Sequence, residues 1–288
     1  LLKHHTILVP TDCSHAEEVG QETMKGVTFD VSAARFILAK TAGRITDSAL
    51  FGALSGVRLR DLPSPQLPGP EWVEIEVISA GICGSDIGNL TYASSPAMEP
   101  FGSFPAVLGH EILGRVSAVG ARVTKVSPGQ RVTMDPMISC TARGYAADNS
   151  CPSCSMGLHS TCERAGEEGI ARLDGRPMSA GLTIGYHRDL PGGWGEKVIA
   201  HQSQVFTVDD AVADNAAVLL EPLSIALHSV LATPPVDQEP VLVIGSGTIA
   251  LCTIWALRAT GFRGPLLAQA KREHERELAR PLGATAVV

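Results

Sequence analysis

Two short stretches of the chain carry side chains that could hold a metal ion next to a substrate. Cys83 lies within Gly-Ile-Cys-Gly-Ser-Asp, and His110 and Glu111 follow Gly109 just before an apolar run. A thiolate, an imidazole and a carboxylate all suit Zn²⁺, and such a mixed set favours catalysis over a structural role. Each stretch alone is weak evidence, because a lone Cys or His is usually a packed or satisfied residue.

A second group of possible ligands is formed by cysteines. The chain has seven, and without a secretory signal they indicate metal binding or catalysis before disulfides. Four of them cluster in a stretch rich in Gly and Pro, with ten, two and seven residues between them: Cys140, Cys151, Cys154 and Cys162. This spacing favours one tetrahedral structural Zn²⁺ over two disulfides or chance clustering. Cys13 and Cys252 are interpreted as ordinary thiols.

Length and charge narrow the class of protein. The 288 residues suffice for two domains, and the net charge of −7 comes without a long basic block, which argues against nucleic acid. The uncharged run from Val241 to Leu257 is interrupted by Gly-Ser-Gly-Thr, so a membrane span is not expected. The chain opens on Leu with no targeting signal, and we expect a cytoplasmic protein whose natural start is missing.

Short apolar runs bounded by Gly and Pro predict a β-rich region after residue 32. Residues 1–32 show no sustained periodicity and are interpreted as an extension. Residues 62–70 hold four prolines and predict an extended connector. Strands are predicted at residues 35–38, 56–59, 72–78, 112–119, 130–134, 192–199 and 204–208.

The pattern changes to alternating strands and helices near residue 209. Asp209 and Asp210 could cap an Ala-rich helix, and Pro222 could begin another. An apolar strand at 240–244 should be buried on both faces of a parallel sheet. With it, a βαβαβ unit is predicted from a helix at 248–260, a strand at 265–268, a helix at 272–282 and a strand at 286–288.

A glycine turn between that first strand and its helix predicts a dinucleotide site. Gly245 permits the tight turn, Gly247 lets a pyrophosphate approach the helix N-terminus, and Ala250 allows close packing. Thr248 and Ile249 open the helix and are also expected at the cofactor. Lys271 and Arg272 stand where an acidic residue often selects NAD, so NAD or NADP is expected, with a slight preference for NADP.

Taken in order, these motifs resemble the zinc-dependent medium-chain dehydrogenase/reductase (alcohol dehydrogenase) family, especially its threonine and sorbitol dehydrogenase-like branch. The resemblance covers about residue 33 to the end and rests on the Cys83 and His110 stretches, the four-cysteine lobe, Glu221-Pro222-Leu223 and the glycine turn. It implies a mixed fold: a GroES-like β-rich catalytic domain over residues 33–219, then the first half of a Rossmann-type α/β domain over 220–288.

The resemblance also implies roles for particular residues. Cys83 and His110 would bind catalytic zinc, and Glu111 would be a close or direct carboxylate ligand. Glu221 would be the remaining ligand or would hold the zinc-bound water. Ser85 would begin a proton relay, and Asp86 would orient the metal site or simply form a turn. Two zinc ions per chain are expected.

Three departures from the family pattern leave alternatives open. Gly88 stands where the branch usually carries a relay His. The lobe usually has two residues between its first and second Cys, so either Cys140 binds across an eight-residue insertion or Asp148, at the usual spacing, binds instead. The third strand ends the chain, which predicts only half of a cofactor domain.

The expected activity is hydride transfer between NAD(P) and an alcohol, guessed to be a secondary alcohol or polyol, with zinc as Lewis acid. Partners would be a small alcohol or carbonyl compound and further copies of the chain, as a dimer or tetramer. The alternative is a truncated, non-catalytic zinc-binding module. A zinc-free quinone reductase relative is disfavoured, because it would not need these ligands.

Overall fold

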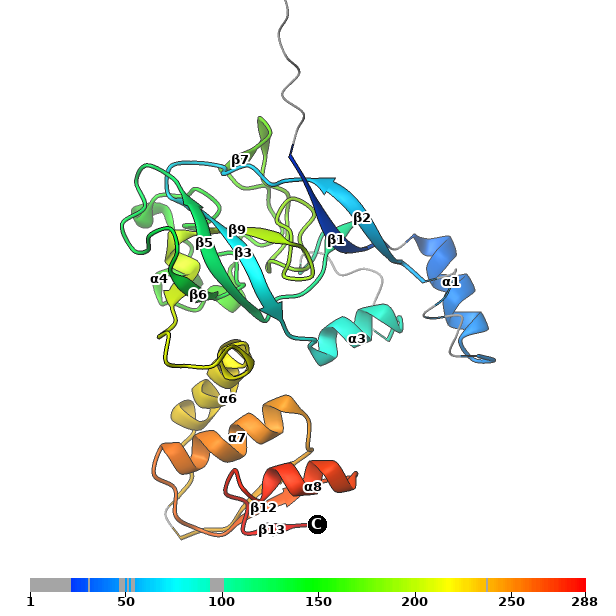
Figure 1. Ribbon diagram of the computed structural model, residues 1–288, viewed down its shortest axis with the longest axis vertical. Helices are drawn as coiled ribbons and strands as arrows, with labels where there is room; N and C mark the ends of the chain where they lie inside the picture. Colours follow the sequence, from blue (N-terminus) through cyan, green and yellow to red (C-terminus); the bar gives the residue numbers. More distant parts are fainter. Residues whose placement is uncertain are drawn as a thin grey trace, which may run out of the picture.

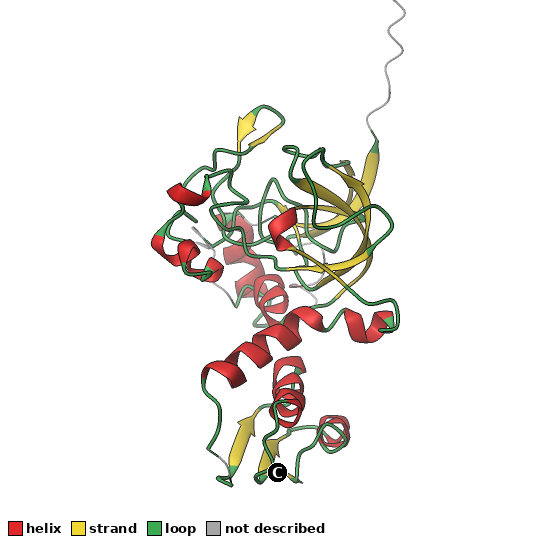
Figure 2. Ribbon diagram, turned by 90° about the vertical axis from the view of Figure 1, so that its left-hand side faces the viewer, coloured by secondary structure: helices red, strands yellow, loops and turns green. Residues whose placement is uncertain are grey.

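The computed structural model describes residues 22–30, 32–46, 50, 52, 55–93, 101–236 and 238–288. A β-rich part forms the upper half of Figure 1, and an α/β unit with helices α7 (Thr248–Ala259) and α8 (Glu273–Ala279) lies below it. Figure 2, turned by 90°, shows the same division, with the longer strands gathered above and the helices concentrated below. The predicted order of a β-rich region followed by an α/β unit is confirmed.

The β-rich part is built on a five-stranded antiparallel sheet in the order β10-β6-β5-β3-β9. Val73 and Ile75 of β3 are buried while Glu76 is exposed, as the predicted alternation requires. The strands are β3 (Trp72–Ala80), β5 (Ile112–Val119), β6 (Arg131–Met134), β9 (Lys197–His201) and β10 (Val205–Thr207). Residues 192–195, predicted as part of a strand, form the turn before β9.

A second sheet, in the order β2-β1-β4, corrects two predictions. Strand β1 (Thr23–Phe29) lies within the stretch interpreted as an extension and pairs with β2 (Val57–Pro63) and β4 (Ala106–Val107). The strand predicted at 35–38 is wrong, because these residues belong to helix α1 (Ala33–Ala42). The Ser32 side chain caps that helix by accepting the Arg35 N–H at 3.3 Å, which a short apolar run does not reveal.

Short elements connect the sheets and carry the two ligand groups. Helix α3 (Gly84–Leu90) begins directly after Cys83. The cysteine lobe contains α4 (Pro152–Ser155) and the 3₁₀ turns Ala147–Asn149 and His159–Thr161, and the hairpin β7 (Arg172–Leu173) and β8 (Arg176–Pro177) follows. A third 3₁₀ turn, Gln202–Gln204, joins β9 to β10.

Helix α6 (Leu220–Ala232) leads from the β-rich part into the α/β unit and packs on α7 through Val230 and Ile254. Before it, α5 (Asp214–Ala217) starts at Asp214 instead of being capped by Asp209 or Asp210. The unit's parallel strands follow the predicted order β11-β12-β13. Its elements are β11 (Val241–Ile244), α7 (Thr248–Ala259), β12 (Leu266–Gln269), α8 (Glu273–Ala279) and β13 (Ala286–Val287).

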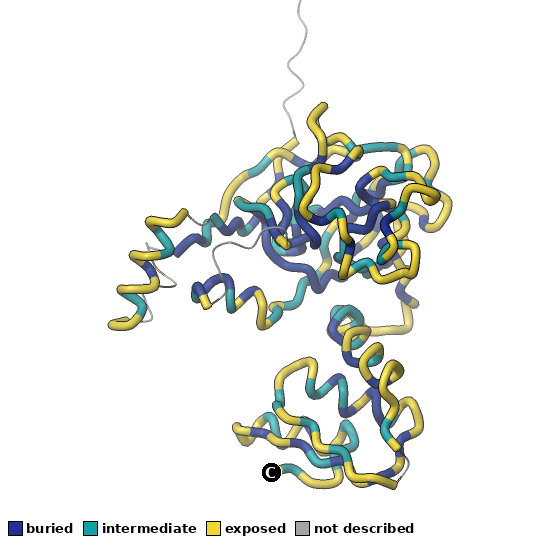
Figure 3. Tube along the Cα trace, turned by 180° about the vertical axis from the view of Figure 1, so that it is seen from behind, coloured by how far each residue is buried: buried dark blue, intermediate teal, exposed yellow. Residues whose placement is uncertain are grey.

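Strand β11 is covered on one face only. Val241 and Val243 pack toward the core that α6, α7 and α8 share, whereas Leu242 is 53% and Ile244 76% exposed. The prediction that this strand is buried on both faces is therefore wrong for this chain. Figure 3 shows buried segments concentrated in the β-rich part and longer exposed stretches in the α/β unit.

Candidate metal centres

The structure brings Cys83, His110 and Glu111 together, with their ligand atoms all within 4.8 Å of one another. The pairing of β3 with β5 achieves this, because it places Ala80 opposite Ile112 and so aligns the loops at both strand ends. A 2.8 Å bond from the Gly81 N–H to the Glu111 carbonyl closes the arrangement. His110 and Glu111 are buried, and Cys83 is half-buried.

Two glycines are required for this approach. A Cβ on Gly81 would lie 1.9 Å from Glu111 Oε2, so any side chain there would displace the carboxylate. Gly109 has a φ of +91°, and a Cβ there would lie 2.4 Å from the Trp194 ring. The glycines that flank both motifs are thus part of the geometry of the site.

Asp86 is fully buried and lies next to the group formed by Cys83, His110 and Glu111. It accepts the Cys83 N–H at 2.9 Å and the Tyr186 hydroxyl at 2.8 Å, and its Oδ1 lies 3.7 Å from His110 Nδ1. That Nδ1 is buried and finds no hydrogen-bond partner among the described residues. The bond to the Cys83 N–H caps the start of α3 and fits the turn-forming role considered from sequence, while the bond to Tyr186 and the position beside His110 fit orientation of the metal site.

The electrostatics of the cluster favour a thiolate and a cation together. Hydrogen bonding to His110, then to Ser85, lowers the pKa of the Cys83 thiol despite its burial. Burial alone would lower the pKa of His110, but the hydrogen bond to Cys83 and the charge of Asp86 outweigh it, so that pKa is raised. Burial raises the pKa of Glu111. A thiolate, an imidazole and a carboxylate in this arrangement are a donor set that fits Zn²⁺.

Glu221, in the first turn of α6, interacts electrostatically with His110 and Glu111 but does not belong to the group of three ligands. Burial raises its pKa to about 7, with His110 acting in the opposite direction and Glu111 and Asp135 adding to the increase. A carboxylate repelled by other carboxylates is stabilised by a divalent cation, so Glu221 also fits a metal at this centre.

Tyr186 is a member of the site that sequence reasoning missed. Its hydroxyl lies 2.9 Å from Ser85 Oγ and 2.8 Å from Asp86 Oδ1, and its ring centroid is 5.3 Å from that of His110. Burial, then the charge of Asp86, raises its pKa, so the phenol stays neutral. It comes from a loop about a hundred residues after Ser85, and no local pattern indicated the contact.

The four lobe cysteines also converge, with all sulfur atoms within 4.8 Å. Backbone N–H groups of the lobe donate to its sulfurs at 3.4 Å, as from Cys151 to Cys140 and from Cys154 to Cys151. Of the two alternatives for the first ligand, Cys140 lies in the group, whereas Asp148 sits in an exposed 3₁₀ turn outside it. Three buried thiols and the half-buried Cys154, without disulfides between them, fit a structural Zn²⁺.

The remaining thiols lie elsewhere. Cys252 is buried on α7, where burial raises the pKa of its thiol. Cys13 lies outside the described residues.

The glycine turn has the geometry expected before a dinucleotide-binding helix. Gly245 has a φ of +111°, and Gly247 is the N-cap of α7, whose first residues are Thr248 and Ile249. Ser246 Oγ donates to Glu275 at 2.7 Å, which ties the turn to α8.

Arg272 interacts with the carboxylate of Glu275, a contact that was not predicted from the sequence. Glu275 accepts the Arg272 N–H at 3.0 Å, and its other oxygen lies 3.4 Å from the guanidinium. Lys271 is exposed. A carboxylate bonded to the glycine turn disfavours a 2′-phosphate there, so these contacts weaken the preference for NADP drawn from the two cations.

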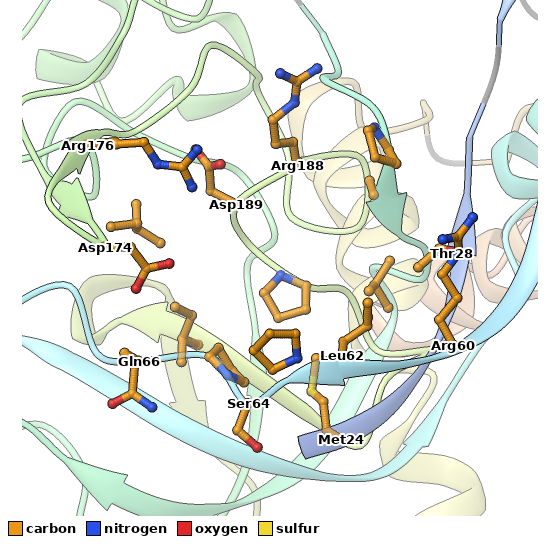
Figure 4. Close-up of a pocket in the computed structure, with 18 of the residues that line it drawn as sticks. Met24, Thr28, Arg60, Leu62, Ser64, Gln66, Asp174, Arg176, Arg188 and Asp189 are labelled. Carbon is orange, nitrogen blue, oxygen red and sulfur yellow. The ribbon is translucent and has the colours of Figure 1, made fainter. Parts of the chain in front are cut away.

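A separate cavity of about 460 Å³ lies between β1, β2 and the β7–β8 hairpin. Figure 4 shows arginines and aspartates around it, among them Arg60, Arg188 and Asp174. None of the residues of either metal group lines this cavity. It is therefore distinct from both centres.

Comparison with known proteins agrees with the geometry. Residues 69–210 match the family model described as the alcohol dehydrogenase GroES-like domain. The (R,R)-butanediol dehydrogenase of Saccharomyces cerevisiae is 29% identical over 238 residues, which cover 77% of this chain and 57% of that protein. The chain belongs to the zinc-dependent medium-chain dehydrogenase/reductase family. The resemblance found from its motifs is confirmed.

Two other dehydrogenases are similar to this chain to a comparable extent. The L-galactonate-5-dehydrogenase of Escherichia coli K12 is 30% identical over 221 residues, covering 75% of this chain and 54% of the relative. A zinc-binding dehydrogenase from Sinorhizobium meliloti 1021, solved bound to NADP, superposes with a TM-score of 0.67 at 27% identity, covering 93% of this chain and 62% of that one. The chain thus spans a little over half the length of these dehydrogenases.

The family fold, a GroES-like domain with a Rossmann-type unit, is confirmed by these matches. Among the described residues, no helix is both long and apolar enough to cross a membrane.

Proposed function

We propose that this chain is part of a zinc-dependent oxidoreductase that transfers a hydride between an alcohol and NAD or NADP. The observation that carries the proposal is the convergence of Cys83, His110 and Glu111 beside a hydroxyl pair, Ser85 and Tyr186. Zinc held there would act as a Lewis acid toward an alcohol or carbonyl oxygen. Relatives named for butanediol and galactonate oxidation support a secondary alcohol or polyol as substrate.

The chain's own residues would divide the work of this reaction. The catalytic metal would be held by Cys83, His110 and Glu111. Glu221 on α6 would be a further carboxylate ligand or would hold the metal-bound water. The buried lobe would hold a second zinc that maintains the fold of the loops after β6. Gly245, Gly247, Thr248 and Ile249 would place the pyrophosphate at the N-terminus of α7.

Tyr186 joins Ser85 and Asp86 in a hydrogen-bond network beside the metal group. A phenol has one hydrogen and an ionised Asp86 can only accept, so Tyr186 donates to Asp86 at 2.8 Å. Ser85 also has one hydrogen, which can go to the Tyr186 oxygen at 2.9 Å or to the Cys83 sulfur. In either arrangement the Ser85 lone pairs can accept the proton of a substrate hydroxyl. Tyr186 would thus hold Ser85 beside the metal group, and Gly88 has no side chain to carry the proton further.

We further propose that the catalytic domain begins at β1 and runs to about residue 219, with residues 220–288 forming part of the cofactor domain. This extends the boundary expected from sequence, because β1 pairs with β2 and β4. A homo-oligomer is proposed on family resemblance alone.

The test uses His110→Ala in the longest natural form of the protein, with the exposed His228→Ala as matched control. A panel of secondary alcohols and polyols is offered with both nicotinamide cofactors, and cofactor binding is followed by fluorescence. We expect His110→Ala to abolish turnover while cofactor binding persists and His228→Ala behaves as wild type. A wild-type protein that binds zinc and cofactor but oxidises none of the panel would favour the alternative, a non-catalytic binding module.

A further inference from the structure

The lobe contains a positive charge that neither metal group nor the proposed reaction explains. Arg143 follows Cys140 by three residues and its side chain is fully buried, one of the largest side chains in the structure to be so. Charged side chains are rarely buried to this extent unless a counter-charge accompanies them.

The neutral contacts of Arg143 are incomplete. One guanidinium nitrogen donates to the Glu167 carbonyl at 3.2 Å, and another makes a short contact to the Gly181 carbonyl. The remaining nitrogen, Nε, is buried and has no hydrogen-bond partner among the described residues. Two carbonyls satisfy donors but supply no negative charge, so they leave the cost of burying the cation largely uncompensated.

The lobe thiols are the groups that can supply negative charge to Arg143, which lies buried in the lobe three residues after the buried Cys140. No carboxylate of the described residues forms an ion pair with it. Burial lowers the pKa of the guanidinium, whereas Cys162, by charge and hydrogen bonding, and then Cys140 act to raise it. A guanidinium stays charged at any working pH, so the balance has to come from thiolates.

We propose that Arg143 is a built-in counter-ion of the four-cysteine metal site, placed there by the long connection between Cys140 and Cys151. Four thiolates around one divalent cation leave two net negative charges in a buried lobe, and the guanidinium offsets one of them. Arg143 lies inside the insertion that separates this lobe from the usual family spacing. The insertion thus allows Cys140 to join the other three cysteines and also contributes the positive charge of Arg143.

Metal and arginine should stabilise each other. Without metal the thiols can be neutral, and the buried guanidinium of Arg143 then has no negative charge near it to compensate its own. With metal the thiolates are fixed and the arginine lowers the electrostatic energy of the site. The inference depends on metal binding by the lobe and is independent of dehydrogenase activity, so a failure of the proposed function would leave it standing.

The test measures transfer of zinc from the lobe to a chelating dye at neutral pH. A Cys83→Ser, His110→Ala background leaves the lobe as the predicted site, so the signal comes from one ion. Arg143→Gln removes the charge but keeps a donor, and Arg143→Lys keeps the charge with fewer donors. Arg164→Gln is the matched control, because Arg164 belongs to the same lobe but is half-buried and stacks on Tyr145.

We expect Arg143→Gln to release zinc about tenfold faster or more, whereas Arg143→Lys and the Arg164 control stay within about threefold of the parent. Equal effects of Gln and Lys would overturn the proposal, since hydrogen bonding and not charge would then be what matters. Failure of both variants to fold would do the same, because the charge retained by Lys would not have sufficed.

A second measurement separates charge from packing. Cys162→His replaces one thiolate by a neutral imidazole and removes one negative charge from the site. In that background one net negative charge remains at the site instead of two, so Arg143→Gln should accelerate zinc release less than it does in the four-cysteine protein. An undiminished effect of Arg143→Gln in the Cys162→His background would show that Arg143 acts only as packing.

Discussion

The hydroxyl of Tyr186 offers a sharp test of the site's internal hydrogen bonds. Tyr186→Phe removes one oxygen from a position that is almost fully buried, without changing the ring that lies beside His110. Asp86 Oδ1 loses its 2.8 Å donor, and Ser85 loses its 2.9 Å partner. Because Asp86 is fully buried, water cannot easily replace the lost bond.

The expected loss in the free energy of unfolding follows from these contacts. A buried hydrogen bond to an ionised group contributes about 1.5–3 kcal/mol, and the Ser85 contact adds less because the serine can turn toward Cys83. We therefore expect Tyr186→Phe to lower stability by about 2–3 kcal/mol. Under the proposed function, turnover of the full-length protein should fall as well, because Ser85 loses the partner that holds its hydroxyl beside the metal group.

The matched control is Tyr145→Phe. The Tyr145 hydroxyl reaches the Glu168 carbonyl at 3.5 Å in an exposed position, and its ring still stacks under Arg164 after the change. This substitution should cost about 0.5 kcal/mol or less. Urea unfolding of the zinc-loaded protein, followed by fluorescence, measures both variants. Equal costs for the two would refute the inference that Tyr186 donates to an ionised, buried Asp86.

Two further predictions concern groups close to the metal. In metal-free protein the raised pKa of Glu221 makes the folded state bind more protons than the unfolded state, so stability should fall as pH rises from 4.5 to about 7. Glu221→Gln should remove about 1–2 kcal/mol of that fall, allowing for partial exposure, and unfolding curves across this pH range would show it. Gly81→Ala should weaken zinc binding at the Cys83, His110 and Glu111 group about 10- to 100-fold, because its Cβ would displace Glu111. Gly84→Ala, with nothing within 4 Å of its Cβ, should leave metal affinity unchanged in the same titration, and equal affinities for both variants would contradict the geometry.

Sequence patterns located the long and periodic elements well. The strand predicted at 112–119 has the bounds of β5, and the helix predicted at 248–260 differs from α7 by one residue. Such elements are determined by local hydrophobic periodicity, which the sequence displays directly. The candidate metal ligands could also be found, because the Cys83 and His110 stretches occur in one chain with a four-cysteine cluster, whereas a lone Cys or His is usually a packed residue.

Apart from helix α1, the features that were missed depend on contacts between distant segments. Residues 35–38 gave an apolar run that fits either a strand or a helix, and the Ser32 cap decided for the helix. Strand β1 is specified by its partners β2 and β4, and no alternation of its own revealed it. Tyr186 and Arg143 act through neighbours far along the chain, so their roles became visible only in three dimensions.

The most direct test of the account is the zinc content of the purified protein and its variants. Because two separate groups of ligands converge, the parent should hold two zinc ions per chain. The Cys151→Ser, Cys154→Ser variant should hold one, and adding Cys83→Ser and His110→Ala should leave none. An unchanged zinc content after the lobe substitutions, or zinc that survives all four, would contradict the assignment of these residues as two metal centres.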